Sequence, residues 1–353
     1  MSEIIIKLKG GTGNQLFQAA AAASLAAIYE KSCRFSKDNI YKDKYNRKLE
    51  ISSLLSKLEV LENLKKENIN SLFLDEYDID HPIYFSKSSP LAKLENDIHL
   101  EGYFTNYRIH NKNVLKKIKT HIKGLHINPK FKKNNYIAIH TRELHGNVAN
   151  QLIYSIDNLN IDYYSKCLNK VAKNKFLSKI KYAIVFSDLW KNPENSKLIP
   201  KIKALLKRNG IKYINGDNEI NSSLEIINIF SYAKCCIISN STLSWWGAYL
   251  SNGKIFSPVM NLWEPNLKVP DNWNQIYANE IAPKTHHRKL RFKTLSLNNK
   301  VISNKVYSLK RLKIIKFTRF ITTKLSSLKI FIKFKRWLNC KGILSENSYR
   351  TFF

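Results

Sequence analysis

The sequence predicts an α/β fold with two halves and a basic C-terminal tail, and three observations lead to this prediction. A strand, a glycine-rich turn and an alanine-rich run open the chain, short apolar strands alternate with helices from residue 135, and the composition turns basic after Pro283. The 353 residues exceed what one compact core usually holds. Because 44% of the residues are hydrophobic, we expect a folded protein and not a disordered one.

The first predicted unit is a strand, a turn and a helix. Residues 2–9 predict the strand, and Gly10, Gly11 and Gly13 predict a tight turn after it. The run 15–29 consists of strong helix formers. The start of such a helix offers free backbone N–H groups and a positive dipole end, which favour an anionic ligand.

The second half predicts a doubly wound parallel sheet, whereas the stretch 31–132 is irregular and predicts only weak helices and acidic loops that complete a first domain. The expected elements are strand 136–140, helix 162–174, strand 182–188, helix 197–210, strand 211–216, helix 222–234, strand 235–240, helix 241–252 and strand 254–259. Short apolar strands between helices are typical of a sheet that is covered on both faces. Ligands of such sheets bind beyond the carboxyl ends of the strands.

The net charge of +32 is concentrated in the tail, where Lys284 to Lys341 include 18 Lys and Arg residues and no Asp or Glu. A charge confined to one segment, without a nucleic-acid motif, argues against nucleic acid as the partner. Apolar residues recur in the tail at helical spacing. This predicts either a helix on an anionic membrane surface or a stripe that packs back on the domains.

The cysteines and the N-terminal sequence predict a cytoplasmic protein, with possible peripheral contact at the inner face of the membrane through the tail. No secretion signal or membrane-spanning run is evident. The five cysteines, Cys33, Cys167, Cys235, Cys236 and Cys340, are scattered without the spacing of a zinc site, which is typical of reduced thiols.

Two segments carry the strongest functional pattern. The first, from Gly10 to Gln18, reads GGTGNQLFQ and places amides and a hydroxyl at the junction of strand and helix. The second, from Asn240 to Tyr249, reads NSTLSWWGAY and follows an apolar strand. Hydroxyls and N–H groups at a helix start suit a diphosphate, and we expect the two tryptophans of this segment to wall the site.

These two segments resemble the α-1,2-fucosyltransferases of glycosyltransferase family 11, bacterial type, in which GGxGNQ(L/M)FQ and NSTFSWWGAWL occupy similar places. The segments 102–104 (GYF) and 186–188 (FSD) are similar to two further family signatures. The resemblance implies a GT-B arrangement of two Rossmann-like domains. It also implies GDP-fucose as the donor, inversion at the anomeric carbon, and no metal or other cofactor.

The change of pattern near residue 135 and the change of composition after Pro283 divide the chain into three parts. With the resemblance, these are an acceptor-side domain (1–132), a GDP-sugar-binding domain (133–284) and the tail (285–353). On this basis, the residues expected to bind the GDP-sugar are Gly11, Asn14, Gln15, His140, Arg142, Asp188, Glu225, Asn240, Ser241, Thr242 and Ser244. Glu225 has a second interpretation as an ordinary charge in the first turn of a helix.

The segment 140–145 (HTRELH) departs from the family signature HxRRxD. Arg142 matches, and its guanidinium suits the charge that develops on the leaving GDP. Glu143 replaces the second arginine and His145 replaces the aspartate that is the usual candidate base. His145 and Glu143 are therefore alternative bases, and each has a second interpretation as a plain polar loop residue.

The predicted function is transfer of L-fucose to a hydroxyl, with the 2-hydroxyl of galactose as the expected one, in a cell-surface glycan precursor such as the lipopolysaccharide O-antigen. The alternatives are a GDP-sugar-binding protein that has lost its base and a transferase of another GDP-linked sugar. The pair Asp78 and Asp80 resembles the metal-binding DxD of other sugar transferases. It lies in an acidic loop and does not follow a buried strand, so we expect no metal there.

Overall fold

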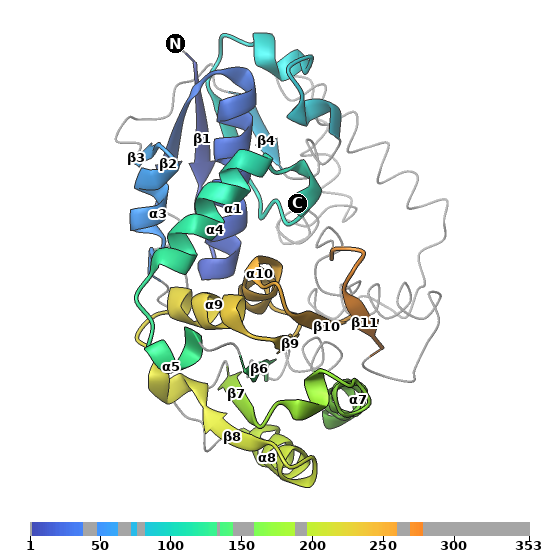
Figure 1. The fold of residues 1–353 in the computed structure, drawn as a ribbon. Coiled ribbons are helices and arrows are strands. Elements are labelled where there is room, and N and C mark those ends of the chain that lie inside the picture. Colours follow the sequence, from blue (N-terminus) through green and yellow to red (C-terminus); the bar gives the residue numbers. More distant parts are fainter. Residues whose placement is uncertain are drawn as a thin grey trace, which may run out of the picture. The chain divides into compact units, whose positions relative to one another are not determined.

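The computed structural model describes residues 2–37, 48–62, 72–75, 82–132, 135–143, 159–187, 196–259 and 269–277 (Figure 1). All of them belong to one compact unit formed by residues 1–144 and 157–280. The tail, residues 285–353, lies outside the described residues. Within the described ranges, no helix is both long and apolar enough to cross a bilayer. The domain boundaries given above stay predictions.

The unit contains two parallel sheets, and the first comes from the N-terminal part of the chain. Its strands are β1 (Glu3–Lys7), β2 (Ser32–Ser36), β3 (Val60–Glu62), β4 (Leu72–Asp75) and β5 (Ile98–Glu101). They are arranged in the order β3-β2-β1-β5-β4, and every described pairing is parallel. Sheet 1 thus has β1 at its centre, with Ile4 and Ile6 fully buried.

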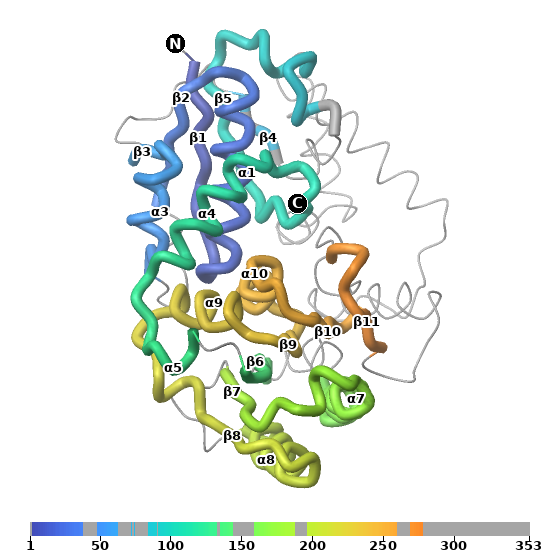
Figure 2. The backbone as a smooth tube through the Cα atoms, viewed as in Figure 1, coloured from blue at the N-terminus to red at the C-terminus, as the bar shows by residue number. Residues whose placement is uncertain are grey.

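Two longer helices pack beside this sheet. Helix α1 (Thr12–Tyr29) follows β1, and its alanines let the backbone approach the strands closely. Helix α4 (Lys112–Gly124) contacts α1 and buries one apolar face (Figure 1). The short helices are α3 (Ser52–Lys57), α5 (Pro129–Lys132), η1 (Pro82–Phe85), η2 (Pro90–Lys93) and η3 (Tyr107–Ile109). Figure 2 follows the chain from β5 through α4 to α5.

The second sheet has six strands, and it is also parallel in every described pairing. Its strands are β6 (Tyr136–Thr141), β7 (Tyr182–Ser187), β8 (Lys212–Asn215), β9 (Cys235–Ile237), β10 (Lys254–Pro258) and β11 (Asn274–Ile276). The order is β11-β10-β9-β6-β7-β8. The main helices are α7 (Ile161–Ala172), α8 (Ile199–Arg208), α9 (Ser223–Tyr232) and α10 (Thr242–Leu250), with short turns η4 (Leu177–Lys179) and η6 (Gly216–Glu219).

The predicted α/β class is confirmed, and so is the alternation of strands and helices in the second half. The irregular reading of residues 31–132 was wrong, because β2 to β5 lie in this stretch and form most of sheet 1. These strands have three to five residues each, too few to show a clear hydrophobic period. The four described cysteines are free and buried, as expected for reduced thiols.

The turn after β1 also differs from the prediction. Gly10 has a φ of +78°, in the region that only glycine adopts readily, and it makes the turn. Gly13 does not belong to the turn, since α1 already begins at Thr12. The reason for a glycine at position 13 is packing, because a Cβ there would lie 2.4 Å from the backbone nitrogen of Leu243 in α10.

We expect Gly13→Ala to lower the free energy of unfolding by about 1–3 kcal/mol, because the added methyl group meets the backbone of α10, which cannot rotate away. Gly124→Ala is the matched control, since a Cβ at that helical position meets nothing within 4 Å. Denaturant unfolding of both variants tests this. A loss of stability at Gly124 equal to that at Gly13 would contradict the packing argument.

Candidate functional site

The candidate site lies at the carboxyl ends of three neighbouring strands, β9, β6 and β7. His140 near the end of β6 pairs in register with Phe186 of β7. Its Nδ1 lies 2.6 Å from the hydroxyl oxygen of Ser239, which follows β9. The two strand ends predicted to hold the ligand are therefore joined by a direct hydrogen bond.

His140 is buried and neutral. Burial, helped by the nearby positive charge of Arg142, lowers the pKa of His140 to about 3. Its imidazole thus has one N–H donor and one acceptor nitrogen at physiological pH. A neutral ring can fix the orientation of the Ser239 loop without adding charge to the site.

Arg142 follows β6 directly and is half-buried. Its Nη1 donates to the carbonyl oxygen of Asn240 at 2.7 Å, so the guanidinium is anchored beside the loop that leads into α10. A guanidinium has five N–H donors in a planar fork. The arrangement brings a fixed positive charge close to the start of a helix, where a diphosphate also finds backbone donors.

The two motif segments meet at the starts of α1 and α10. Thr242 Oγ1 donates to Asn14 Oδ1 at 2.7 Å. Gly11, which precedes α1, has no side chain to cap the helix, and Ser241, which precedes α10, makes no side-chain hydrogen bond to the first turn. By contrast, Asn and Ser side chains cap α4, α7 and α9. The motif helices therefore differ from these other helices in starting without a side-chain cap.

Two other predicted ligands of the GDP-sugar point inward. Gln15 is fully buried, and its Nε2 donates to the carbonyl oxygens of Gly10 and Lys48 at 3.0 and 2.9 Å. Ser244 is fully buried as well, and its hydroxyl donates to backbone oxygens within 3.5 Å. Both side chains hold the loops of the site in shape in this structure.

The expectation that Trp245 and Trp246 wall the site was wrong. Both are fully buried. Their ring centroids lie 4.8 and 4.9 Å from the ring centroid of Phe17 in α1. Trp246 Nε1 donates to the carbonyl oxygen of Gly13 at 3.0 Å. The two tryptophans fasten α10 to α1, and an indole N–H finds its partner there.

Glu143, one of the two alternative bases, is turned toward the start of α8. Its carboxylate accepts hydrogen bonds from the N–H groups of Lys197 and Leu198 at 2.9 and 3.0 Å and from the hydroxyl of Ser196. Both carboxylate oxygens thus serve as a helix cap. This position disfavours Glu143 as the base for an acceptor hydroxyl.

Glu225 fits its second interpretation, a charge in the first turn of α9. Its backbone N–H donates to Ser222 Oγ at 3.4 Å, while its carboxylate accepts from the Ser222 hydroxyl and from the N–H of Asn221, both at 3.2 Å. This reciprocal arrangement is similar to a capping box, with the N–H of Asn221 in place of that of Ser222. It accounts for Glu225 without a ligand.

The structure adds two carboxylates that the sequence analysis missed. Glu50 accepts from Thr12 Oγ1 at 2.7 Å and from the N–H of Ser223 at 3.2 Å, so it joins the starts of α1 and α9. Asp217, which follows β8, accepts from the N–H of Ser187 at 3.2 Å. The strand-end rule could have found Asp217, whereas no pattern marks Glu50.

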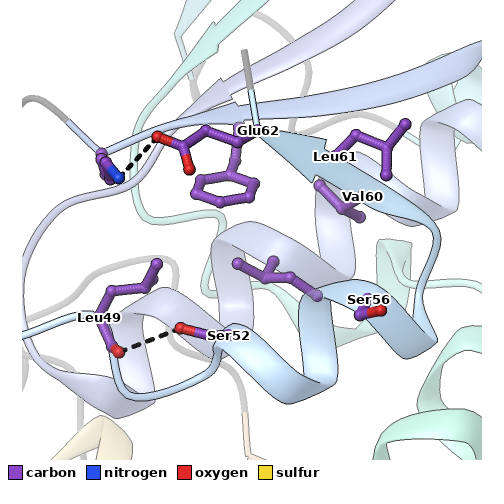
Figure 3. Close-up of a pocket in the computed structure, with 9 residues that line it drawn as sticks. Leu49, Ser52, Ser56, Val60, Leu61 and Glu62 are labelled. Atoms are coloured by element: carbon purple, nitrogen blue, oxygen red, sulfur yellow. Dashed lines mark hydrogen bonds and ion pairs between the residues drawn. The ribbon is translucent and has the colours of Figure 1, made fainter. Parts of the chain in front are cut away.

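A cavity of about 460 Å³ lies between helix α3 and the strands β2 and β3 of sheet 1 (Figure 3). Its wall combines apolar side chains such as Leu49 and Val60 with the hydroxyls of Ser52 and Ser56. Leu49 directly precedes Glu50, so the cavity wall continues into the segment that contacts α1. A surface of this mixed character suits a small polar ligand with apolar faces.

Some predicted residues lie outside the described part of the chain: His145, Asp188 and the pair Asp78 and Asp80. Within the part that is described, no group of three His, Cys, Asp or Glu side chains is close enough to hold a metal.

Comparison with known proteins decides the family. The family model described as glycosyl transferase family 11 matches residues 68–266, which is more than half of the chain. The chain belongs to glycosyltransferase family 11. It is therefore a glycosyltransferase, and the resemblance inferred from the GGTGNQLFQ and NSTLSWWGAY segments is confirmed.

No curated protein matches the family 11 chain significantly. Among solved structures it is similar to POFUT1 in complex with GDP (12% identity, 72% of this chain and 98% of the other, TM-score 0.40). It is also similar to the fucosyltransferase NodZ from Bradyrhizobium (11% identity, 71% and 94%, TM-score 0.40). Similarity at this level is too low to transfer residue roles.

The buried neutral His140 gives a prediction for acid stability. Between about pH 6.5 and pH 3, the unfolded chain binds a proton at this imidazole and the folded protein does not, so stability falls as the pH falls. We expect His140→Asn to reduce the slope of unfolding free energy against pH by up to about 1.4 kcal/mol per pH unit between about pH 5 and pH 6.

Urea unfolding at several pH values measures this slope. His126→Asn, at an exposed histidine, is the control for the removal of one imidazole. Equal slopes for the wild type and His140→Asn would show that the imidazole is protonated in the folded protein.

Proposed function

We propose that the chain is an inverting fucosyltransferase that moves L-fucose from GDP-fucose to the 2-hydroxyl of a galactose unit in a cell-surface glycan precursor. The observation that carries this proposal is the contact between the two family segments, Thr242 Oγ1 to Asn14 Oδ1 at 2.7 Å, beside the anchored guanidinium of Arg142. Family membership supports glycosyl transfer as the reaction class. The residues of the GGTGNQLFQ and NSTLSWWGAY segments support fucose as the transferred sugar.

The diphosphate of the donor fits the start of α10. Arg142 supplies a full positive charge there, and Ser241 and Thr242 supply hydroxyls next to the N–H groups of the first turn. These groups would hold GDP in the ground state and stabilise it more strongly as it leaves, because negative charge grows on the β-phosphate when the bond to fucose breaks. We propose that the reaction requires no metal.

The reaction exchanges one bond at the anomeric carbon of fucose for another. The acceptor oxygen attacks this carbon on the face opposite to GDP, the carbon–oxygen bond to the β-phosphate breaks, and GDP leaves with the bonding electrons. The acceptor hydroxyl loses its proton to a base. We propose His145 for this role, since the Glu143 carboxylate caps α8.

We propose that the acceptor binds on the side of sheet 1. The cavity near Ser52 and Ser56 offers hydroxyls for sugar hydroxyl groups and aliphatic side chains for the apolar face of a pyranose ring. Glu50 connects this region to the starts of α1 and α9. An acceptor in this place would lie next to the segment that carries Thr12 and Asn14.

Release of the nucleoside diphosphate from a panel of nucleotide sugars tests the function. We expect release from GDP-fucose, with and without a galactose-terminated acceptor, to exceed release from GDP-mannose and UDP-galactose, and to persist in EDTA. Tight GDP binding without turnover on any acceptor would instead indicate a binding protein that has lost its base. Loss of activity in EDTA, restored by Mn²⁺, would contradict metal independence.

We expect Arg142→Lys to reduce kcat by about 10²–10³, because an ammonium group cannot reproduce the two-point contact of a guanidinium with phosphate oxygens. The control is Arg208→Lys at the exposed end of α8, which should retain wild-type activity. Near-normal turnover of Arg142→Lys, with an unchanged melting temperature, would exclude the role that we assign to Arg142.

A further inference from the structure

The amino edge of sheet 2, opposite to the candidate site, presents a row of lysines. Lys254 and Lys212 are the first residues of β10 and β8, and Lys234 and Lys181 immediately precede β9 and β7. All four side chains are exposed. Backbone hydrogen bonds from Lys254 to Lys234 (2.9 Å) and from Lys212 to Lys181 (2.8 Å) fix the row. Neighbouring strands are about 4.8 Å apart, so the lysines form two close pairs, Lys254 with Lys234 and Lys212 with Lys181, and β6 lies between the two pairs.

The loops at the same edge add further positive charge. The turn between α7 and β7 contributes Lys173, Lys175 and Lys179, and the end of α8 contributes Lys207 and Arg208. No Asp or Glu occurs in the segments 173–182, 207–213, 233–235 and 251–255 that form this edge. Within the described part of the chain, none of these basic side chains forms an ion pair. We name these nine basic residues, together with Phe176 and Tyr182, the amino-edge surface.

Two large apolar side chains protrude among these charges. Phe176 is 71% exposed and Tyr182 is 45% exposed, and both stand in the segment that carries Lys175, Lys179 and Lys181. An isolated exposed aromatic residue needs no explanation. Two exposed aromatic residues within a basic surface are typical of a protein face that inserts its rings between charged lipid headgroups.

Helix dipoles explain only part of this charge. Lys173, Lys207 and Arg208 stand at the C-terminal ends of α7 and α8, where a positive charge is favourable. The four lysines of the strand row have no such reason. Like charges placed this close repel one another, so the row suggests an anionic partner.

We propose that the amino-edge surface binds the anionic surface of a lipid bilayer. Lysine dominates the surface, with Arg208 as the only arginine, and a diffuse layer of lipid phosphates attracts ammonium groups without needing the planar fork that base recognition uses. Phe176 supplies an apolar anchor. Docking by this edge leaves the carboxyl edge, with His140 and Arg142, turned away from the bilayer and open to nucleotide sugars.

Co-sedimentation of the full chain with vesicles tests the proposal. We expect binding to phosphatidylcholine vesicles with about 30 mol% phosphatidylglycerol, release at about 0.5 M salt, and no binding to phosphatidylcholine alone. Replacement of Lys181, Lys212, Lys234 and Lys254 by glutamine should weaken the binding at least about tenfold.

The matched control replaces the four exposed lysines Lys57, Lys93, Lys112 and Lys201 by glutamine. It removes the same charge from positions away from the amino edge and should retain most of the binding. Equal weakening in both quadruple variants would overturn the proposal, because net charge and not this surface would then determine attachment. Circular dichroism and thermal melting establish that each variant is folded.

A second pair of variants tests the anchor without changing the charge. Phe176→Ser should weaken vesicle binding about three- to tenfold, whereas Leu61→Ser, at a position 57% exposed in β3, should not. Unchanged binding of Phe176→Ser together with unchanged binding of the amino-edge quadruple variant overturns the proposal. So does binding of the wild type to a single-stranded oligonucleotide in preference to anionic vesicles.

Discussion

The contact between the starts of α1 and α10 is the constraint on which the site depends. A glycine at position 13 lets the backbones approach, and the indole N–H of Trp246 then reaches the Gly13 carbonyl at 3.0 Å. The buried rings of Phe17, Trp245 and Trp246 exclude water from the contact between α1 and α10. The half-buried hydrogen bond from Thr242 to Asn14 lies at the edge of this apolar contact. The two family segments, more than 200 residues apart, are thereby held as one structure.

The acidic residues around the site also serve a common purpose, which is to hold helix starts. Glu143 caps α8, Glu225 caps α9, and Glu50 joins the starts of α1 and α9. Each carboxylate offsets the positive end of a helix dipole. The starts of α1 and α10 have no side-chain cap, and Arg142 is anchored beside α10. The charge balance of this edge therefore favours an anion at α10.

Much of the second half could be predicted from the sequence, because strands such as β6 and β7 are continuous apolar runs between amphipathic helices. Strands β2 to β5 could not be predicted, since each is short and is stabilised as a strand only by pairing with its neighbours in sheet 1. The same limit applies to the site. Motifs located Arg142 and Thr242, whereas the inward orientation of Trp245 and the capping role of Glu143 depend on contacts with α1 and α8 that no local pattern encodes.

The topology of sheet 2 gives its two edges different electrostatic environments. In a parallel sheet with crossover helices, every helix starts at the carboxyl edge and ends at the amino edge, so the dipoles alone would attract anions to the first and cations to the second. At the carboxyl edge the side chains act in the same direction as the helix dipoles, because Arg142 and the start of α10 form a site suited to a diphosphate. At the amino edge, the lysine row exceeds what the helix ends require and makes that edge positive as well. A domain that is positive at both edges can bind a soluble anion at one and a fixed anionic surface at the other.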